Sequence, residues 1–522
     1  MSGPLRPATE LARLPLMVTL TAGAGALMLL PAGYALGLGD LRLARIFGAS
    51  GAMVLVLAIM AGLAVRGNRG AAPERSILRT MLAVMVLLPV VLALPLAQAL
   101  PDTGLFNAWW EMVSALTTTG ATLYAPELLL PPVHLWRGLV GWAGGLFVLV
   151  TAISVLAPLR LGGFEILAPS GEDASATLRA ASAERDSAAR IARSFVAIAP
   201  VYAGLTAALY VALLMAGDAP LVALMRAMGT LSTSGIAPVA GGVGASSGLA
   251  GEILVAGFLV LALSRRFWPG GGALRASPRV TGDPELRMAL AVVLAVAVAL
   301  FARHFVALTH GEAVAAQSGL AAAWGGFFNA LSYLTTTGWN STEWEGARAW
   351  SGLSAPGLLL AGLAIMGGGV ATTAGGVKLL RVYALARQSQ RELERMIHPH
   401  SVAGGGAVER RLREKGAFLA FIFFMLFAVS IAATVVLVSL WPVPFDTAVI
   451  LSIAALTNTG PLASTIPLIP VTEASAGLAS APFDGWSGLA PFTKSVLAGA
   501  MIVGRLETLA ILAMFAPDHW RR

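Results

Sequence analysis

The chain has 522 residues, of which 57% are hydrophobic and 12% are charged. A soluble domain carries about 25% charged residues, so this composition excludes an ordinary soluble protein and indicates a polytopic membrane protein. The net charge of +8 does not come from a separate basic domain, because the Lys and Arg residues flank apolar runs, and no nucleic-acid partner is expected.

The absence of cysteine excludes disulfides, iron–sulfur clusters and thiol catalysis. The six histidines show no His-Glu-x-x-His spacing, so metal-dependent hydrolysis has little support. We therefore expect neither an enzyme nor a resident cofactor.

The first two apolar runs, residues 14–38 and 46–65, are each long enough to cross a bilayer and are predicted to be N-terminal spans. Later runs of about 20 residues are predicted to be eight more spans, so the whole chain belongs to the all-α class. They lie near residues 79–100, 135–158, 193–216, 249–264, 285–302, 355–377, 415–440 and 490–516.

Between the members of each later pair of spans lies a shorter apolar stretch, such as residues 106–116 and 327–334. These stretches are too short to cross the bilayer and are predicted to be re-entrant half-helices. The predicted units are two N-terminal spans and four pore repeats, with boundaries at 1–70, 71–170, 171–280, 281–400 and 401–522.

A hydroxyl-rich peptide ending in glycine follows each half-helix, and we call these four segments the glycine peptides. They are residues 116–120, 231–235, 334–338 and 456–460, and their glycines are 115, 103 and 122 residues apart. One such cluster is most often an ordinary loop, but four copies in the same context indicate a repeat.

Irregular backbone at membrane depth is tolerated where it is buried in protein or lines a water-filled cavity. Four such segments around an axis could replace the hydration shell of a monovalent cation with their carbonyl oxygens, and glycine permits the positive φ and close approach that this needs. The predicted selectivity filter consists of Thr118, Thr119, Gly120, Thr233, Ser234, Gly235, Thr336, Thr337, Gly338, Asn458, Thr459 and Gly460.

The basic residues predict the orientation of the chain. The connections 66–79, 160–193, 265–287 and 378–415 hold 4, 5, 5 and 9 Lys and Arg residues, whereas the four regions around the glycine peptides hold three. The positive-inside rule then places both termini and the linkers in the cytoplasm and the glycine peptides near the outer face. The regions around the glycine peptides also carry acidic residues, which would attract cations to the outer mouth of a pore. The alternative is that they are ordinary solvated loop charges. These residues are Asp102, Glu127, Glu343, Glu345 and Asp446.

At these residues the chain resembles the TrkH/KtrB/HKT superfamily of potassium transporters, and its TrkH branch most closely. The resemblance covers essentially the whole chain. It rests on Trp110-Glu111 with Thr117-Thr118-Thr119-Gly120-Ala121-Thr122, Trp136-Arg137 with Gly144-Gly145, Phe328-Asn329 with Thr336-Thr337-Gly338, Thr457-Asn458-Thr459-Gly460-Pro461, and Gly504-Arg505-Leu506-Glu507.

This resemblance implies channel-like potassium uptake through a pseudo-fourfold pore in the cytoplasmic (inner) membrane, with K⁺ as the bound and transported ion. It also implies a homodimer with one pore per protomer, contact with membrane lipid, and a TrkA-like cytoplasmic nucleotide-binding regulator. Ser234 replaces the first glycine of the pair that is usual in the second repeat, which bears on how strictly K⁺ is preferred over Na⁺.

Two elements are predicted to form a gate. The segment 367–376 contains Gly367, Gly368, Gly369, Gly375 and Gly376, which disfavour a continuous helix. The resemblance implies an intramembrane loop beneath the filter; close packing of helices through small residues is the alternative. Lys378, at the end of this segment, is predicted to be an interface anchor.

The second gate element is Arg505, a charged residue in the apolar run 496–515. The resemblance implies that its side chain projects into the pore and opposes the passage of ions, and the alternative is a structural ion pair with another span. Glu507 should lie on a different face of the helix and not neutralise Arg505.

Two other functions remain open from the sequence. A carrier that couples potassium to a proton or to sodium would need titratable side chains in the spans, and these are scarce. A polytopic membrane enzyme would need converging acids, bases or metal ligands, and the spans offer few besides Arg505 and Glu507.

Overall fold

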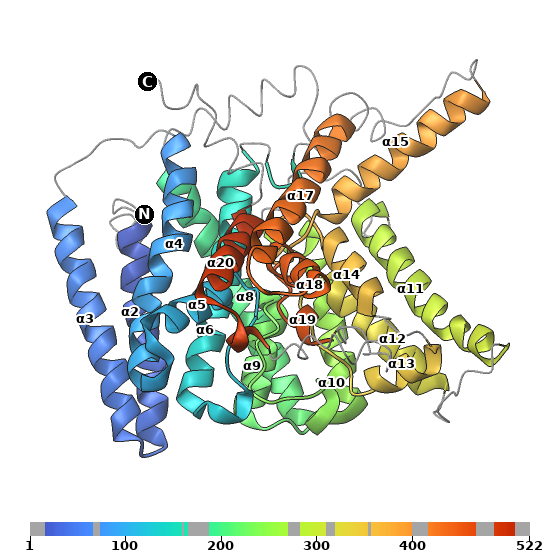
Figure 1. Cartoon of the computed structure of the whole chain (residues 1–522). Coiled ribbons are helices and arrows are strands. Elements are labelled where there is room, and N and C mark those ends of the chain that lie inside the picture. The colour runs from blue at the N-terminus through green and yellow to red at the C-terminus, as the bar shows by residue number, and fades with distance from the viewer. Residues whose placement is uncertain are drawn as a thin grey trace, which may run out of the picture.

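The computed structural model describes residues 16–65, 74–158, 161–164, 187–269, 282–309, 319–352, 357–398, 416–465 and 485–506. Within these ranges the chain is helical and contains no strand, which confirms the predicted all-α class. Figure 1 shows the helices as one group, with α15 (Leu379–Ile397) projecting from it.

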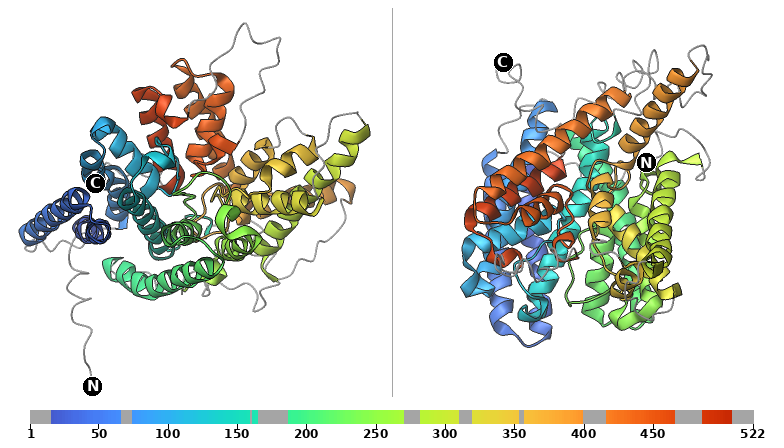
Figure 2. Two further views of the ribbon diagram at one scale, coloured as in Figure 1. Left: turned by 90° about the horizontal axis from the view of Figure 1, so that it is seen from below. Right: turned by 45° about the vertical axis from the view of Figure 1, so that its right-hand side comes forward.

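The two N-terminal spans are α2 (Leu16–Gly37) and α3 (Leu41–Val65), which pack closely along each other at one edge of the molecule (Figure 2). Small residues permit this approach, because a Cβ on Gly51 would lie 2.9 Å from the carbonyl oxygen of Gly25. On its other side α2 contacts α4 and α6 of the first repeat.

Four similar units follow, each with a long helix, a short pore helix and a returning helix. The first unit is α4 (Glu74–Ala99), α5 (Gly104–Leu116) and α6 (Pro131–Thr151), which continues as the π-helix η3 (Ala152–Leu156). The second is α8 (Ser187–Met215), α9 (Pro220–Ser232) and α10 (Gly244–Leu259), followed by the 3₁₀ turns η5 (Val260–Ala262) and η6 (Arg265–Phe267).

The third unit is α11 (Pro284–Thr309), α12 (Gly319–Leu334), the short α13 (Trp344–Ser351) and α14 (Gly357–Met366). The fourth is α17 (Gly416–Ser439), α18 (Phe445–Leu456), the single turn α19 (Leu462–Thr465) and α20 (Pro491–Leu506). Seen from below, the four units lie around a common centre (Figure 2, left), as the repeat in the sequence predicted.

Eight of the described helices are long and apolar enough to cross a membrane, judged by length and composition. They are Leu16–Gly37, Leu41–Val65, Leu78–Ala99, Pro131–Leu156, Ala189–Met215, Gly244–Ala262, Pro284–Phe305 and Gly416–Ser439. The chain is therefore a multi-pass membrane protein, in agreement with its composition.

The remaining two predicted spans, residues 355–377 and 490–516, are not among these eight long helices. In the span 355–377 the helix α14 ends at Met366 after 10 residues, because the Gly-rich segment follows, and this part is a loop as predicted. In the span 490–516, the structure describes the helix α20 (Pro491–Leu506). The rest of the predicted span lies outside the described residues.

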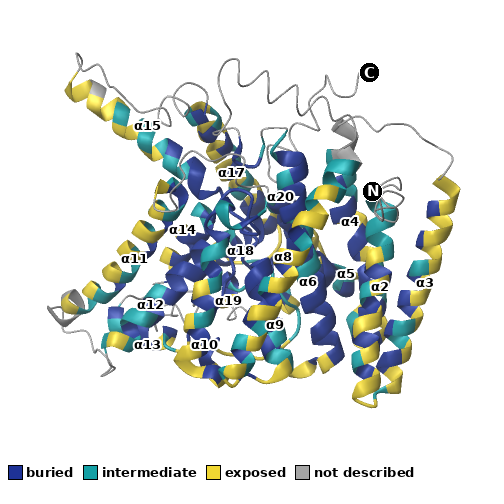
Figure 3. Ribbon diagram, turned by 180° about the vertical axis from the view of Figure 1, so that it is seen from behind, coloured by how far each residue is buried: buried dark blue, intermediate teal, exposed yellow. Residues whose placement is uncertain are grey.

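Burial is highest at the centre of the four units and lowest on the outward faces (Figure 3). The outward faces are apolar, as on α17, where Phe418, Val429 and Val436 are all more than 60% exposed. Such an apolar outer surface fits a hydrocarbon surrounding. The polar and glycine-rich segments are instead buried at the centre.

Candidate functional site

The four pore helices end in the same unusual backbone conformation. Two residues before each glycine, the chain adopts a left-handed conformation, with φ of 55°, 53°, 57° and 54°. The residues are Thr118, Thr233, Thr336 and Asn458. Three of them are β-branched, a residue type for which positive φ is rare and strained, so surrounding contacts must hold this conformation.

The hydrogen bonds at these helix ends also repeat. The N–H of the residue before each glycine donates to the carbonyl oxygen five residues earlier, at 2.9 to 3.0 Å. The pairs are Thr119 with Ser114, Ser234 with Gly229, Thr337 with Ser332, and Thr459 with Ala454. This is the pattern of a Schellman C-cap, in which glycine normally holds the left-handed position.

The four glycine peptides touch one another in a closed ring. A Cβ on Gly120 or on Gly235 would collide with a carbonyl oxygen of the next peptide, and one on Gly338 would lie 2.9 Å from a proline ring. The ring closes where the Gly460 N–H donates to the Thr119 carbonyl oxygen at 2.6 Å. The contacts run in chain order: Gly120 to Ser234, Gly235 to Thr337, Gly338 to Pro461, and Gly460 to Thr119.

The fourth peptide differs from the others. Gly120, Gly235 and Gly338 have φ of 72°, 59° and 78°, a region that favours glycine, whereas Gly460 is not among the positive-φ residues. Glycine is instead required at position 460 because the backbone of Ala121 lies too close to leave room for a Cβ. The ring therefore has three similar members and one distinct member.

The ring is rich in oxygen atoms and lies at the C-terminal ends of four helices. Helix C-termini carry a partial negative charge, which favours a cation beside them. Thr118 Oγ1 and Asn458 Oδ1 are buried without a hydrogen-bond partner among the described residues. The Asn458 amide is fixed by its Nδ2, which donates to Thr119 Oγ1 at 3.0 Å and to the Met501 carbonyl oxygen at 2.9 Å.

Buried polar side chains behind the ring hold the chain that leaves it. Glu111 on α5 pairs with Arg137 on α6 at 2.7 Å and also accepts the N–H of Leu123 at 3.0 Å. Asn329 on α12 accepts the N–H of Ser341 at 2.9 Å. The residue types were visible in the sequence as parts of the family resemblance, but their role as braces was not predicted.

The Gly-rich loop, residues 367–376, lies against the ends of the pore helices. The Gly375 N–H donates to Thr336 Oγ1 at 2.7 Å, and Thr373 Oγ1 donates to the Leu231 carbonyl oxygen at 3.1 Å. A Cβ on Gly375 would collide with the carbonyl oxygen of Thr457. The loop therefore touches the helix ends of the second, third and fourth repeats.

The glycines of this loop permit close backbone contacts on its other side. Gly367 and Gly376 have φ of 72° and 74°, and a Cβ on Gly368 would lie 2.6 Å from the carbonyl oxygen of Ala262. The Gly369 N–H donates to the same carbonyl oxygen at 2.9 Å. Helix packing through small residues, the alternative interpretation of these glycines, does not describe this segment, because it forms a loop and not a helix.

A cavity of about 30 Å³ lies between this loop, the π-helix η3 and α20. Gly504 and Arg505 of α20 line it, and the loop contributes Ala371, Thr372, Ala374, Gly375 and Gly376. Its volume suffices for about two water molecules. The two predicted gate elements thus face one small space.

Arg505 is buried, and its Nε and Nη2 atoms have no hydrogen-bond partner among the described residues. No carboxylate of the described chain forms an ion pair with it. This does not support the alternative of a structural ion pair within that part of the chain. Glu507 lies outside the described residues.

The prediction for Lys378 is wrong. It is 8% exposed, lines the same cavity as Arg505, and its Nζ donates to the Ala374 carbonyl oxygen. An interface anchor would extend its ammonium group to water, but here the turn between the loop and α15 directs the side chain inward. Two basic side chains therefore border the cavity.

The acidic residues of the predicted outer mouth are at the surface. Asp102, Glu127, Glu345 and Asp446 are exposed, and Glu343 is partly exposed. Exposed charges act through a field that salt screens, so their effect on cations is modest. Among the described residues no group of three or more His, Asp or Glu side chains could hold a metal ion.

Comparisons with known proteins agree with this picture. Residues 285–521 match the family model TrkH, described as a cation transport protein. The Trk system potassium uptake protein TrkI of Halomonas elongata is 28% identical over 433 residues, covering 81% of this chain and 79% of that protein. TrkH of Salmonella typhimurium, also a Trk system potassium uptake protein, is 27% identical over 426 residues, covering 81% and 80%.

The fold also has a counterpart among solved structures. The crystal structure of the potassium transporter TrkH from Vibrio parahaemolyticus aligns with a TM-score of 0.76 at 23% sequence identity. The alignment covers 98% of this chain and 100% of that chain.

Proposed function

With its resemblance to the TrkH/KtrB/HKT superfamily confirmed by these matches, we propose that this chain is a potassium uptake protein in which ions cross through the ring of glycine peptides. The observation that carries the proposal is the ring itself. Four peptides from four repeats meet in chain order, each at the C-terminal end of a pore helix.

The chemistry of the ring suits a monovalent cation that has lost most of its water. Carbonyl and hydroxyl oxygens replace the hydration shell, and the pore-helix ends add negative potential without a fixed full charge. Full carboxylates would bind a cation more tightly and release it more slowly. Buried oxygens without protein partners in the described chain, Thr118 Oγ1 and Asn458 Oδ1, are available as further ligands.

The gate in this proposal is the Gly-rich loop together with Arg505. The loop lies against the ends of three pore helices, and Arg505 borders the adjoining cavity with a positive charge. An ion in the cavity would be repelled by Arg505 and by Lys378. Passage then requires the loop or these side chains to move, so the described conformation is a closed one.

We also place the chain in the cytoplasmic membrane, with both termini and the linkers inside, as a homodimer that works with a TrkA-like nucleotide-binding regulator. The distribution of basic residues supports the orientation. The relatives named above belong to Trk systems, which supports a regulated assembly. Neither K⁺ nor the regulator requires a resident cofactor in this chain.

The test is ion flux into vesicles that contain the purified chain, with K⁺, Rb⁺ and Na⁺ compared at imposed voltages and a pH dye inside. Uptake of K⁺ and Rb⁺ that follows the voltage without proton movement is expected. Potassium uptake that needs a proton or sodium gradient would instead identify a symporter. No uptake of any monovalent cation, with or without a regulator, would refute the proposal.

A further inference from the structure

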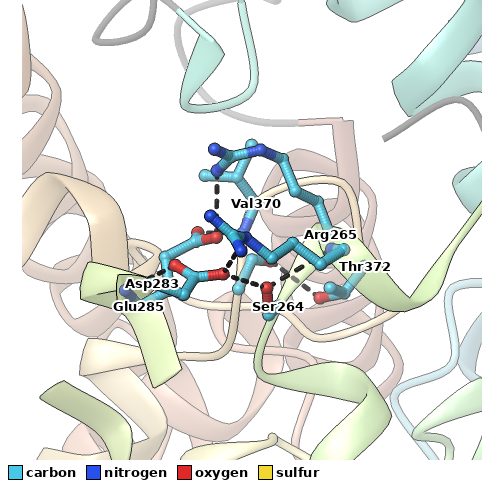
Figure 4. A network of polar contacts seen from close by, with 8 residues as sticks. Ser264, Arg265, Asp283, Glu285, Val370 and Thr372 are labelled. Carbon is cyan, nitrogen blue, oxygen red and sulfur yellow. Dashed lines mark hydrogen bonds and ion pairs between the residues drawn. The ribbon is translucent and has the colours of Figure 1, made fainter. Parts of the chain in front are cut away.

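A buried cluster of charged side chains joins the end of the second repeat to the start of the third (Figure 4). Arg265 pairs with Glu285 at 3.0 Å, and Arg266 pairs with Asp283 at 3.1 Å. Ser264 Oγ donates to Asp283 at 2.6 Å. Ser264, Arg265, Asp283 and Glu285 are each no more than 2% exposed.

Asp283 also organises the first turn of α11. Its Oδ1 accepts the N–H of Glu285 at 3.0 Å, which is the bond of a helix N-cap, and Pro284 occupies the first helical position. The direction of the Glu285 side chain is therefore set by the cap and by Arg265. Both carboxylates of the cluster are paired.

A hydrogen bond joins Glu285 of this cluster to the Gly-rich loop. Glu285 Oε1 accepts the backbone N–H of Val370 at 2.8 Å, as Figure 4 shows. The neighbouring Gly369 N–H donates to the Ala262 carbonyl oxygen, which belongs to the same end of the second repeat as Arg265. The first half of the loop is thus bonded to the junction, and the second half to the pore-helix ends.

This arrangement has a mechanical consequence. A buried N–H group must have an acceptor, and a buried carboxylate must have a partner, so Val370 and Arg265 cannot leave Glu285 without a compensating change. The Arg265 pair and the Val370 bond use different oxygens of one carboxylate. A shift of η6 against the start of α11 must therefore be accompanied by a change at the loop.

We propose that Glu285 is a positioning residue for the Gly-rich loop, and that the Arg265–Glu285 pair couples the junction between the second and third repeats to the gate. The inference rests on the proposed role of this loop in gating. Its test uses a readout that does not depend on ion flux.

The chain contains no cysteine, so a single introduced thiol can report on the loop without background. Thr372 is 1% exposed and lines the cavity, and its replacement by Cys exchanges one small side chain for another. In the full-length protein in vesicles, Thr372→Cys should react slowly with a small charged thiol reagent. Adding Glu285→Ala should speed the reaction about tenfold, because the loop loses its acceptor and opens locally.

A matched control is Glu252→Gln, which alters another buried glutamate, located on α10 and bonded to Thr342. This control should leave the reactivity of the introduced thiol at its parental rate. Equal reaction rates in the parent, Glu285→Ala and the control would overturn the proposal. Size-exclusion profiles establish that each variant is folded.

A second pair of variants keeps the test decisive if Glu285→Ala does not fold. Arg265→Gln alone leaves the buried Glu285 carboxylate without its Arg265 partner and should raise the reactivity of the introduced thiol about tenfold. Arg265→Gln combined with Glu285→Gln replaces the ion pair with two neutral amides and should return the reaction rate toward that of the parent. A double variant as reactive as Arg265→Gln alone would contradict the coupling. Changed reactivity with unchanged K⁺ flux would retain the role of Glu285 in loop position and reject the loop as a gate.

Discussion

Glu111 and Asn329 occupy equivalent places in two repeats, each nine residues before the glycine of its glycine peptide. Each accepts the backbone N–H of the residue three positions after that glycine, Leu123 at 3.0 Å and Ser341 at 2.9 Å. The glycine peptide is thus held at both ends, by the helix cap before it and by this brace after it. The brace restricts how far the ring can relax around an ion.

Replacing Glu111 tests this brace. Glu111→Gln keeps an acceptor for Leu123 but removes the charge that pairs with Arg137, and breaking a buried ion pair costs about 3 to 5 kcal/mol. We expect a lower thermal unfolding temperature and a K⁺/Na⁺ flux ratio reduced several-fold. The control is Glu127→Gln, which alters an exposed residue on the same connection. A Glu111→Gln protein with parental stability and selectivity would show that the brace does not shape the ring.

Substitutions at the individual glycines of the ring should lower the preference for K⁺ by different amounts. A side chain at Gly120 meets the backbone carbonyl of Ser234, whereas one at Gly338 meets the Pro461 ring. A non-glycine residue at positive φ also costs about 1 to 3 kcal/mol. Gly120→Ser and Gly338→Ser should both lower the preference for K⁺ over Na⁺, and Gly120→Ser should lower it more.

Flux ratios in vesicles measure this difference. Gly204→Ser is the control, because Gly204 is exposed on α8 and a Cβ added there would have no neighbouring atom within 4 Å. If both filter variants kept the parental selectivity, the assignment of the glycine peptides as a filter would be wrong.

Much of this fold follows from patterns that are local in the sequence. The length of each apolar run predicts a span, and the glycines of residues 367–376 predict the interruption that ends α14 at Met366. The fourfold recurrence of the glycine peptides predicts that they meet. Each of these features depends on the residue composition of a short segment, which can be read from a single sequence.

Other features depend on contacts between distant segments. The left-handed conformation of Thr118 contradicts its residue preference and is stabilised by the cap and by the neighbouring peptides, so no local pattern predicts it. Counts of basic residues treat all charges alike, yet Arg265 and Arg381 are buried, the first in an ion pair and the second over the Phe423 ring. The prediction for Lys378 fails because its charge alone does not reveal that its side chain is buried.

We expect the regulator to dock on the basic linker after the third repeat, where residues 378–415 hold nine Lys and Arg residues. Its first part is the end of α15, where Leu393, Met396 and Ile397 are exposed, and residues 399–413 lie outside the described chain. We expect a TrkA-like protein to be captured by the parent and not by a variant with residues 388–413 replaced by a Gly/Ser linker. Binding is measured by pull-down from purified components.

A Gly/Ser replacement of residues 466–484, a segment predicted to lie on the other side of the membrane, is the control and should bind normally. Undiminished capture by the 388–413 variant would place the docking surface elsewhere. Contact of this basic segment with anionic lipid would then be the better explanation of its charge.

Arg505 should act as an electrostatic barrier, because it borders the cavity without a carboxylate partner in the described chain. At an effective dielectric constant of about 20 to 80, a unit charge about 6 Å away raises the energy of a cation by about 0.7 to 2.8 kcal/mol. Arg505→Ala should therefore increase K⁺ or Rb⁺ flux between several-fold and about a hundredfold, or reduce its dependence on the regulator. Arg505→Lys keeps the charge and should stay close to the parent. A folded Arg505→Ala protein with unchanged or lower flux, together with a reduced unfolding temperature, would instead assign Arg505 a structural role.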